Sequence, residues 1–219
     1  MRFVPEFEIP KWEPRERVNL TPDQIKTLFE KCENPNLLLY ISMYTFMVMR
    51  STEITRLEWS RVDLGKRIVF LSVKDVKTKK PREVPINSFV HKLLTVRKAK
   101  SKSPWVFPNH NDPSRHMDRS GFRNPFNDLL EACKFPEHIT PHDLRATGEK
   151  HANKNTKFTD SQREAFAGAK IDVQKKKYVK LKADDLRGIE ESVQVEGLSE
   201  ILEMKLRSSS GGNLGEKKP

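Results

Sequence analysis

Two arginines in this sequence stand where they could hold an anion. Arg145 ends the string Ile-Thr-Pro-His-Asp-Leu-Arg at 139–145, and Arg50 directly follows a long apolar stretch. A guanidinium is planar and permanently charged, and its paired N–H groups match two oxygens of a phosphate group. His142 comes three residues before Arg145, so both side chains leave the same face of one helical turn. A plainer interpretation is an ordinary helix start, in which Asp143 complements the positive end of the helix dipole.

Tyr178 lies in the most densely basic part of the sequence. Six lysines flank it between 170 and 182, and Asp172 is the only acid in that interval. A phenol with its usual pKa of about 10 is a weak nucleophile at neutral pH, and a positive field favours the phenolate. The other tyrosines, Tyr40 and Tyr44, lie inside the apolar stretch, where packing in the core is expected. The alternative for Tyr178 is an amphipathic anchor in a basic helix.

Two more charged segments accompany these residues. Glu53 follows Arg50 at a spacing that also suits an ordinary surface ion pair, and we expect it to orient neighbouring backbone or arginine side chains. The run 74–82 (KDVKTKKPR) is basic and precedes the string Val-Pro-Ile at 84–86. A solvated basic turn is the usual role of such a run.

Together, these four segments resemble the catalytic domain of the tyrosine site-specific recombinases, the phage integrase family. The first motif is Arg50 and Glu53 followed by Leu-x-Trp, and the last is Gly168 followed ten residues later by Tyr178. Between them lie the basic hairpin and Pro-His-Asp-Leu-Arg at 141–145. The resemblance covers most of the chain, and the order and spacing of the motifs are its specific part.

The resemblance implies a catalytic set of Arg50, Lys77, His142, Arg145 and Tyr178. Such an enzyme cuts and rejoins double-stranded DNA through a 3′-phosphotyrosine, with no cofactor and no metal. The lysine protonates the departing 5′ oxygen, and the histidine assists proton transfer at the tyrosine. Three other lysines of the turn are rivals for the lysine's position; they are Lys74, Lys79 and Lys80.

This sequence departs from the family at Ala169, where a histidine or tryptophan is usual. The family's usual N-terminal DNA-clamping domain is also absent, so the chain resembles a fragment or a shortened protein. A catalytically weakened DNA-binding remnant is therefore one alternative, and DNA relaxation of the type IB topoisomerase kind is another. A purely electrostatic RNA-binding module would require all four motifs to be accidental.

The surrounding pattern predicts a mainly α fold with a small antiparallel β-sheet (α+β), like a recombinase catalytic domain. Residues 1–18 read as a linker or arm, 19–183 as the catalytic domain, 184–207 as a helical segment exchanged between protomers, and 208–219 as a disordered tail. Within 19–183 we expect helices beginning at Thr21-Pro22 and covering 36–49, 52–59, 88–96, 120–133, 141–153 and 159–167. A basic helix at 172–181 follows, and strands are expected at 67–73 and 83–86.

Composition agrees with a polyanionic partner. The formal net charge is +11, with 41 Lys and Arg against 30 Asp and Glu, which favours nucleic acid over a membrane. Cys32 and Cys133 stand alone in the sequence, which favours buried thiols in a reducing cytoplasm over a disulfide or zinc site. We expect a nucleoid-associated cytoplasmic protein that is a monomer alone and a tetramer on synapsed DNA.

Overall fold

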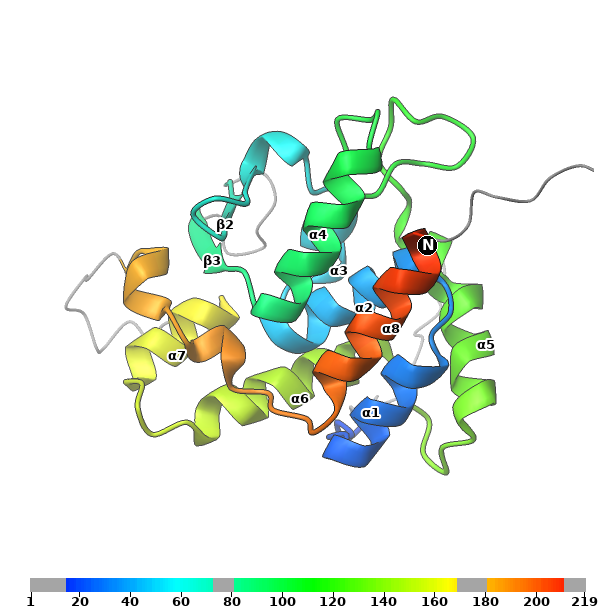
Figure 1. The fold of residues 1–219 in the computed structure, drawn as a ribbon. Helices are drawn as coiled ribbons and strands as arrows, with labels where there is room; N and C mark the ends of the chain where they lie inside the picture. The colour runs from blue at the N-terminus through cyan, green and yellow to red at the C-terminus, as the bar shows by residue number, and fades with distance from the viewer. Residues whose placement is uncertain (1–14, 73–80, 169–180, 211–219) are drawn as a thin grey trace, which may run out of the picture.

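The computed structural model describes residues 15–72, 81–168 and 181–210, which form a bundle of helices with a small sheet at one side (Figure 1). The described helices are α1 (Pro22–Lys31), α2 (Pro35–Met47), α3 (Ser51–Thr55), α4 (Ser88–Lys100), α5 (Arg123–Cys133), α6 (Pro141–Lys154), α7 (Asp160–Ala167) and α8 (Leu198–Ser210). Short 3-10 helices are η1 (Trp59–Arg61), η2 (Arg119–Phe122), η4 (Ala183–Leu186) and η5 (Ile189–Glu191). This is the mainly α fold with a small antiparallel sheet that the sequence predicts.

Helix α2 forms the centre of the core. It begins at Asn34, whose side chain accepts hydrogen bonds from two backbone N–H groups of the first turn. Every residue from Leu37 to Met47 is buried, and α2 packs against α6 and α4. The helix ends where Val48 adopts a left-handed conformation with φ of 52°. The expected buried helix is confirmed, and Tyr40 and Tyr44 lie in the core, 2% and 1% exposed.

The sheet has three antiparallel strands in the order β1 (Val62–Asp63), β2 (Ile68–Leu71) and β3 (Arg82–Pro85). The register pairs Val69 with Val84 in the middle of the hairpin. β3 is an edge strand, which accommodates Pro85 because proline has no N–H to donate to a neighbour. The hairpin and its edge are as predicted, whereas β1 is an addition that the sequence patterns did not indicate.

The third helix is shorter than predicted. A helix was expected over 52–59, but α3 ends at Thr55. Its backbone groups pair instead with a distant loop: the N–H of Trp59 donates to the carbonyl of Pro104, and the N–H of Val106 donates to the carbonyl of Leu57, each at 2.8 Å. These long-range bonds replace the helical ones, so Trp59 begins η1. By contrast, α4 extends past the expected end at 96 to Lys100.

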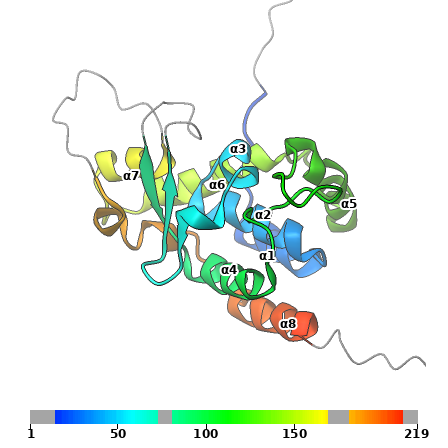
Figure 2. The same ribbon diagram turned by 90° about the horizontal axis from the view of Figure 1, so that it is seen from above.

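The prediction of one helical segment over 184–207 is wrong in its first half. Residues 183–191 form η4 and η5, and only α8 is a regular helix. Gly188 and Gly197 have φ of 90° and 79°, a left-handed conformation that interrupts an α-helix. α8 continues to Ser210, and residues 211–219 of the expected tail lie outside the described residues. α8 packs on α1 and α4 of its own chain (Figure 2).

Candidate active site

Arg50 occupies the N-cap of α3, directly after the central helix. Its Nη1 donates to Glu53 Oε1 at 2.9 Å, and its backbone N–H donates to Glu53 Oε2 at 2.8 Å. The Glu53 side chain is 0% exposed, whereas that of Arg50 is 23% exposed. The expectation that Glu53 orients backbone and arginine is therefore confirmed, and the alternative of a surface ion pair is wrong. The Arg50 side chain therefore remains partly accessible.

Arg145 reaches the same region from α6. Its Nη1 donates to the carbonyl of Val48 at 2.6 Å, and its Nη2 contacts Glu149 Oε1 at 2.8 Å. α6 can approach α2 this closely because Gly148 faces it: a Cβ there would lie 2.2 Å from the carbonyl oxygen of Thr45. The close crossing places Arg145 beside the end of α2, near Arg50.

Arg82 is a third arginine of this cluster, and the sequence analysis missed it by counting it in the basic turn. Its side chain is 10% exposed, and its Nη2 donates to Glu53 Oε2 at 2.9 Å. The strand period of two is the signal that could have found it. Arg82 is two residues from the fully buried Val84, so both leave β3 on the same face.

The three guanidinium groups meet at the C-terminus of α7. Arg82 Nη1 donates to the carbonyl of Phe166, Arg145 Nη2 to that of Ala167 at 2.5 Å, and Arg50 Nη2 to that of Gly168 at 2.8 Å. The last carbonyls of an α-helix lack partners within it and carry the negative end of the dipole. Three successive carbonyls are thereby satisfied by three cations from three different elements.

Burial shifts pKa values within the arginine cluster, defined as Arg50, Arg82 and Arg145, and at Glu53 beside it. Burial lowers the pKa of the Arg82 and Arg145 guanidinium groups, yet arginine stays protonated at any physiological pH. Burial by itself would raise the pKa of Glu53, but the charges of Arg82 and Arg50 outweigh it and lower that pKa. The cluster therefore combines three cations with an ionised Glu53 and is suited to binding an anion.

His142 lies in the first turn of α6 and is exposed, whereas Arg145 one turn later is buried. The imidazole stands edge-on to the ring of Tyr44, with the centroids 6.4 Å apart. His142 is thus at the surface end of the helix that delivers Arg145 to the interior. The helix start itself is as expected, with Pro141 in the first turn and Asp143 closing a capping box with Thr140.

Asp143 does more than cap its helix, because it also ties down residues 15–20. Its carboxylate accepts a charged hydrogen bond from Arg15, and its Oδ1 accepts the N–H of Val18 at 3.1 Å. One turn on, Thr147 Oγ1 accepts the N–H of Leu20 at 3.0 Å. Burial of Asp143 would raise its pKa, but the hydrogen bonds from Thr140 and Arg15 outweigh this and lower the pKa.

Lys77 and Tyr178 fall outside the described residues, as do Ala169 and the three rival lysines. Of the five expected catalytic residues, the structure therefore describes Arg50, His142 and Arg145. It brings the two arginines together on the end of α7. The chain that follows Gly168, the last residue of that cluster, leads in sequence to Tyr178.

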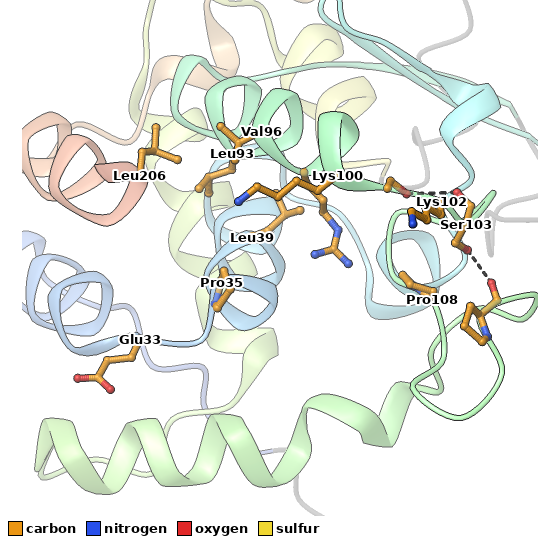
Figure 3. A pocket seen from close by; sticks show the side chains of 13 residues that line it. Glu33, Pro35, Leu39, Leu93, Val96, Lys100, Lys102, Ser103, Pro108 and Leu206 are labelled. Carbon is orange, nitrogen blue, oxygen red and sulfur yellow. Dashed lines mark hydrogen bonds between the residues drawn. The ribbon is translucent and has the colours of Figure 1, made fainter. Parts of the chain in front are cut away.

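A separate hollow of about 730 Å³ lies between α4, the start of α2 and the loop around 101–113, with Leu206 of α8 at its edge (Figure 3). Its described lining is partly apolar, from Leu39, Leu93 and Val96, and partly basic, from Lys100 and Lys102. None of the arginine cluster lines it.

Within the described ranges, no group of His, Cys, Asp and Glu is arranged to hold a metal ion, and no helix has the length and apolarity to cross a membrane. Cys32 and Cys133 are free and buried.

Comparison with known proteins gives a consistent result. The sequence model described as "Phage integrase family" matches residues 18–157. The fold is similar to that of the XerA recombinase, with a TM-score of 0.59 and 17% identity over 95% of this chain. It is also similar to the integrase of mycobacterium phage Brujita, with a TM-score of 0.65 and 14% identity over 90% of this chain. No curated protein sequence matches.

A lambda integrase tetramer bound to a Holliday junction is a further match, with a TM-score of 0.59 and 14% identity over 76% of this chain. This chain spans 68% of the XerA recombinase, 64% of the Brujita integrase and 51% of that lambda integrase. It therefore corresponds to part of each of these proteins. At these identities the likeness concerns the fold.

Proposed function

Because the chain belongs to the phage integrase family, we propose that it cleaves and rejoins DNA strands through a 3′-phosphotyrosine formed by Tyr178. The observation that carries the proposal is the arginine cluster: Arg50 and Arg145 meet at the end of α7, directly before the segment that holds Tyr178. In this proposal the non-bridging oxygens of the scissile phosphate are bound by the guanidinium groups of Arg50 and Arg145.

The proposed reaction requires proton transfer at the attacking and leaving oxygens and stabilisation of the charge on the phosphate. Tyr178 Oη attacks phosphorus and its proton passes towards His142, while the bond from phosphorus to the 5′ oxygen breaks and Lys77 protonates the leaving oxygen. Arg50 and Arg145 stabilise the charge that grows on the non-bridging oxygens, as an oxyanion hole does in acyl transfer. Rejoining is the reverse path, so the energy of the phosphodiester is retained and no nucleotide is consumed.

Double-stranded DNA is the proposed partner, and assembly into a tetramer on synapsed DNA is proposed with it. The net charge of +11 supports a polyanionic partner. Support also comes from the matched structures, which include a Tn1549 integrase with a circular intermediate DNA and the lambda integrase tetramer on a Holliday junction.

The direct test is to trap the covalent complex. The probe is a pool of nicked, end-labelled duplexes with a randomised core. Cleavage near the nick releases a short fragment, so rejoining cannot occur and the covalent adduct is trapped. We expect the wild-type chain to form a denaturant-stable adduct and Tyr178→Phe to form none while binding the same pool with nearly equal affinity. The reason is that the hydroxyl is the nucleophile, whereas binding depends on phosphate contacts. An adduct that survives Tyr178→Phe would refute the assignment.

The second candidate is a DNA-binding remnant with weakened catalysis, which Ala169 favours because alanine has no hydrogen-bond donor in its side chain. The same pool separates the two functions. DNA binding by the wild-type chain without any adduct, at long times and high protein concentration, would support the remnant.

A further inference from the structure

Arg82 connects three elements that carry proposed catalytic residues or lead to them. It lies on β3, which follows the segment with Lys77; it binds Glu53 of α3; and it binds the C-terminal turn of α7. On the basis of the function proposed above, we propose that Arg82 is a positioning residue. It holds Arg50 and the end of α7 in a fixed relation, without itself touching the scissile phosphate.

The first connection runs through Glu53. This carboxylate is 0% exposed, and both of its oxygens are used: Oε1 accepts from Arg50 Nη1, and Oε2 accepts from the Arg50 backbone N–H and from Arg82 Nη2. A buried carboxylate shared by two guanidinium groups has little freedom to rotate. Arg82 therefore fixes the partner that orients Arg50.

The second connection runs to α7. Arg82 Nη1 donates to the carbonyl of Phe166, and the guanidinium packs against Gly168, where a Cβ would lie 2.8 Å from Arg82 Cζ. Gly168 also has φ of 62°, which an L side chain rarely adopts. A glycine at this position lets the last turn of α7 seat directly on Arg82. The same turn supplies the carbonyls that hold Arg145 and Arg50.

The charge of Arg82 matters as much as its shape. The charged groups that face Glu53 within the described part of the chain are Arg82 from β3, Arg50 from the start of α3 and Arg145 from α6. Arg82 makes the largest charge contribution that opposes the effect of burial on Glu53. Without Arg82, burial is opposed mainly by Arg50. The Glu53 carboxyl then protonates at a higher pH than in the wild-type chain, so its ion pair with Arg50 is lost at a higher pH as well.

A first experiment measures the Glu53 carboxyl pKa by ¹³C NMR in the wild-type chain, in Arg82→Met and in Arg97→Met. Arg97 is the matched control because it is also a part-buried arginine, bound to Asn36 and to the Val106 carbonyl and stacked over Phe107, outside the arginine cluster. We expect the Glu53 pKa to rise in Arg82→Met and to stay unchanged in Arg97→Met. An unchanged Glu53 pKa in Arg82→Met would overturn the proposal.

A second experiment measures adduct formation on the nicked duplex pool, with the rate at saturating DNA separated from the affinity. For Arg82→Met we expect the rate to fall roughly tenfold or more, because mispositioned groups cost rate rather than binding. The affinity should change by no more than about twofold, since Arg82 makes no phosphate contact in this proposal. The acid limb of the pH–rate profile should move to higher pH in Arg82→Met, in step with the raised Glu53 pKa. Arg97→Met should lose thermal stability but no rate.

Arg82→Lys keeps the proposal testable if Arg82→Met does not fold. An ammonium retains the charge but does not bridge Glu53 and the Phe166 carbonyl as a fork does. We expect a nearly wild-type Glu53 pKa with an intermediate rate; a fully wild-type rate would overturn the proposal. If the wild-type chain forms no adduct at all, the proposed function fails, while the Glu53 titration still decides whether Arg82 organises the cluster.

Discussion

Arg50 and Arg145 differ in the exposure of their side chains and in the groups to which they donate hydrogen bonds. Both donate to the end of α7, but Arg50 is 23% exposed and Arg145 only 10%. We predict that Arg50→Ala and Arg145→Ala each lower the cleavage rate by roughly a hundredfold or more, as loss of transition-state charge stabilisation does. Single-turnover adduct formation on nicked DNA measures this effect.

The lysine variants at the same two positions serve as controls for charge. Arg50→Lys and Arg145→Lys keep a cation but lose the planar fork, so each should restore only part of the rate. Near-normal cleavage by either alanine variant would show that the phosphate lies elsewhere.

Ala169 is the position at which this sequence departs from its family. In the family, the histidine or tryptophan here is expected to donate a hydrogen bond to a phosphoryl oxygen, and alanine has no donor. One missing donor at such a site costs about 2–4 kcal/mol. We therefore predict that Ala169→His raises the rate of phosphotyrosine formation by about ten- to a thousandfold. An unchanged or lower rate in Ala169→His would mean either that another residue already supplies the donor or that position 169 does not correspond to the family's histidine or tryptophan.

Helix α6 joins the proposed catalytic residues to the strap formed by residues 15–20. Asp143, between His142 and Leu144, makes this connection. Its carboxylate accepts hydrogen bonds from Arg15, Val18 and Thr140. Asp143→Asn keeps the size of the side chain but turns an amide donor towards these donors. We predict a loss of about 1–3 kcal/mol of unfolding free energy at neutral pH, measured by urea denaturation.

The pH dependence of this loss has a definite sign. The pKa of Asp143 is lowered in the folded chain, so its stabilising contribution is present above the unfolded pKa and disappears as the pH falls through the folded pKa. The difference between the wild-type chain and Asp143→Asn should therefore shrink below a pH of about 4. Asp128→Asn, at an exposed position on α5, is the control and should leave stability nearly unchanged. A gap that persists undiminished in acid would contradict this account.

Deleting the C-terminal segment is a poor test of its expected exchange between protomers. Leu186, Ile189 and Val193 are buried in the main core, so deleting 184–219 would unfold the chain as well as remove α8. Exchange of α8 remains a prediction. Its own contacts are with α1 and α4, and it is better tested by changes on the exposed face of α8, where Met204 is 59% exposed.

Charge is unevenly distributed over the protein. Residues 183–207 contain seven Asp and Glu against three Lys and Arg, although the net charge of the chain is +11. The positive charge is therefore concentrated in the rest of the chain, where the arginine cluster lies. We predict that DNA binding is weak and falls steeply with salt, with a log–log slope equivalent to several released counterions. Fluorescence anisotropy on a labelled duplex across salt concentrations measures this slope, and a flat response would contradict it.

The features that could be predicted from the sequence are those that depend on neighbours within a turn or a strand pair. Thr21 begins α1 as expected, and Asn87 caps the helix expected from residue 88, because a helix cap is made within three residues of itself. The apolar stretch forms the central helix α2, which Asn34 caps in the same local way. The candidate residues Arg50, His142 and Arg145 were likewise identified from motifs only a few residues long.

Which side chains share the site depends on packing between elements that lie far apart in the sequence. Arg82 meets Glu53 across 29 residues and Phe166 across 84, and Asp143 meets Arg15 across 128. The early end of α3 has the same origin, since its backbone pairs with residues 104–106. A local pattern carries no record of such pairings, because a buried charge or carbonyl takes its partner from whichever element the packed core brings next to it.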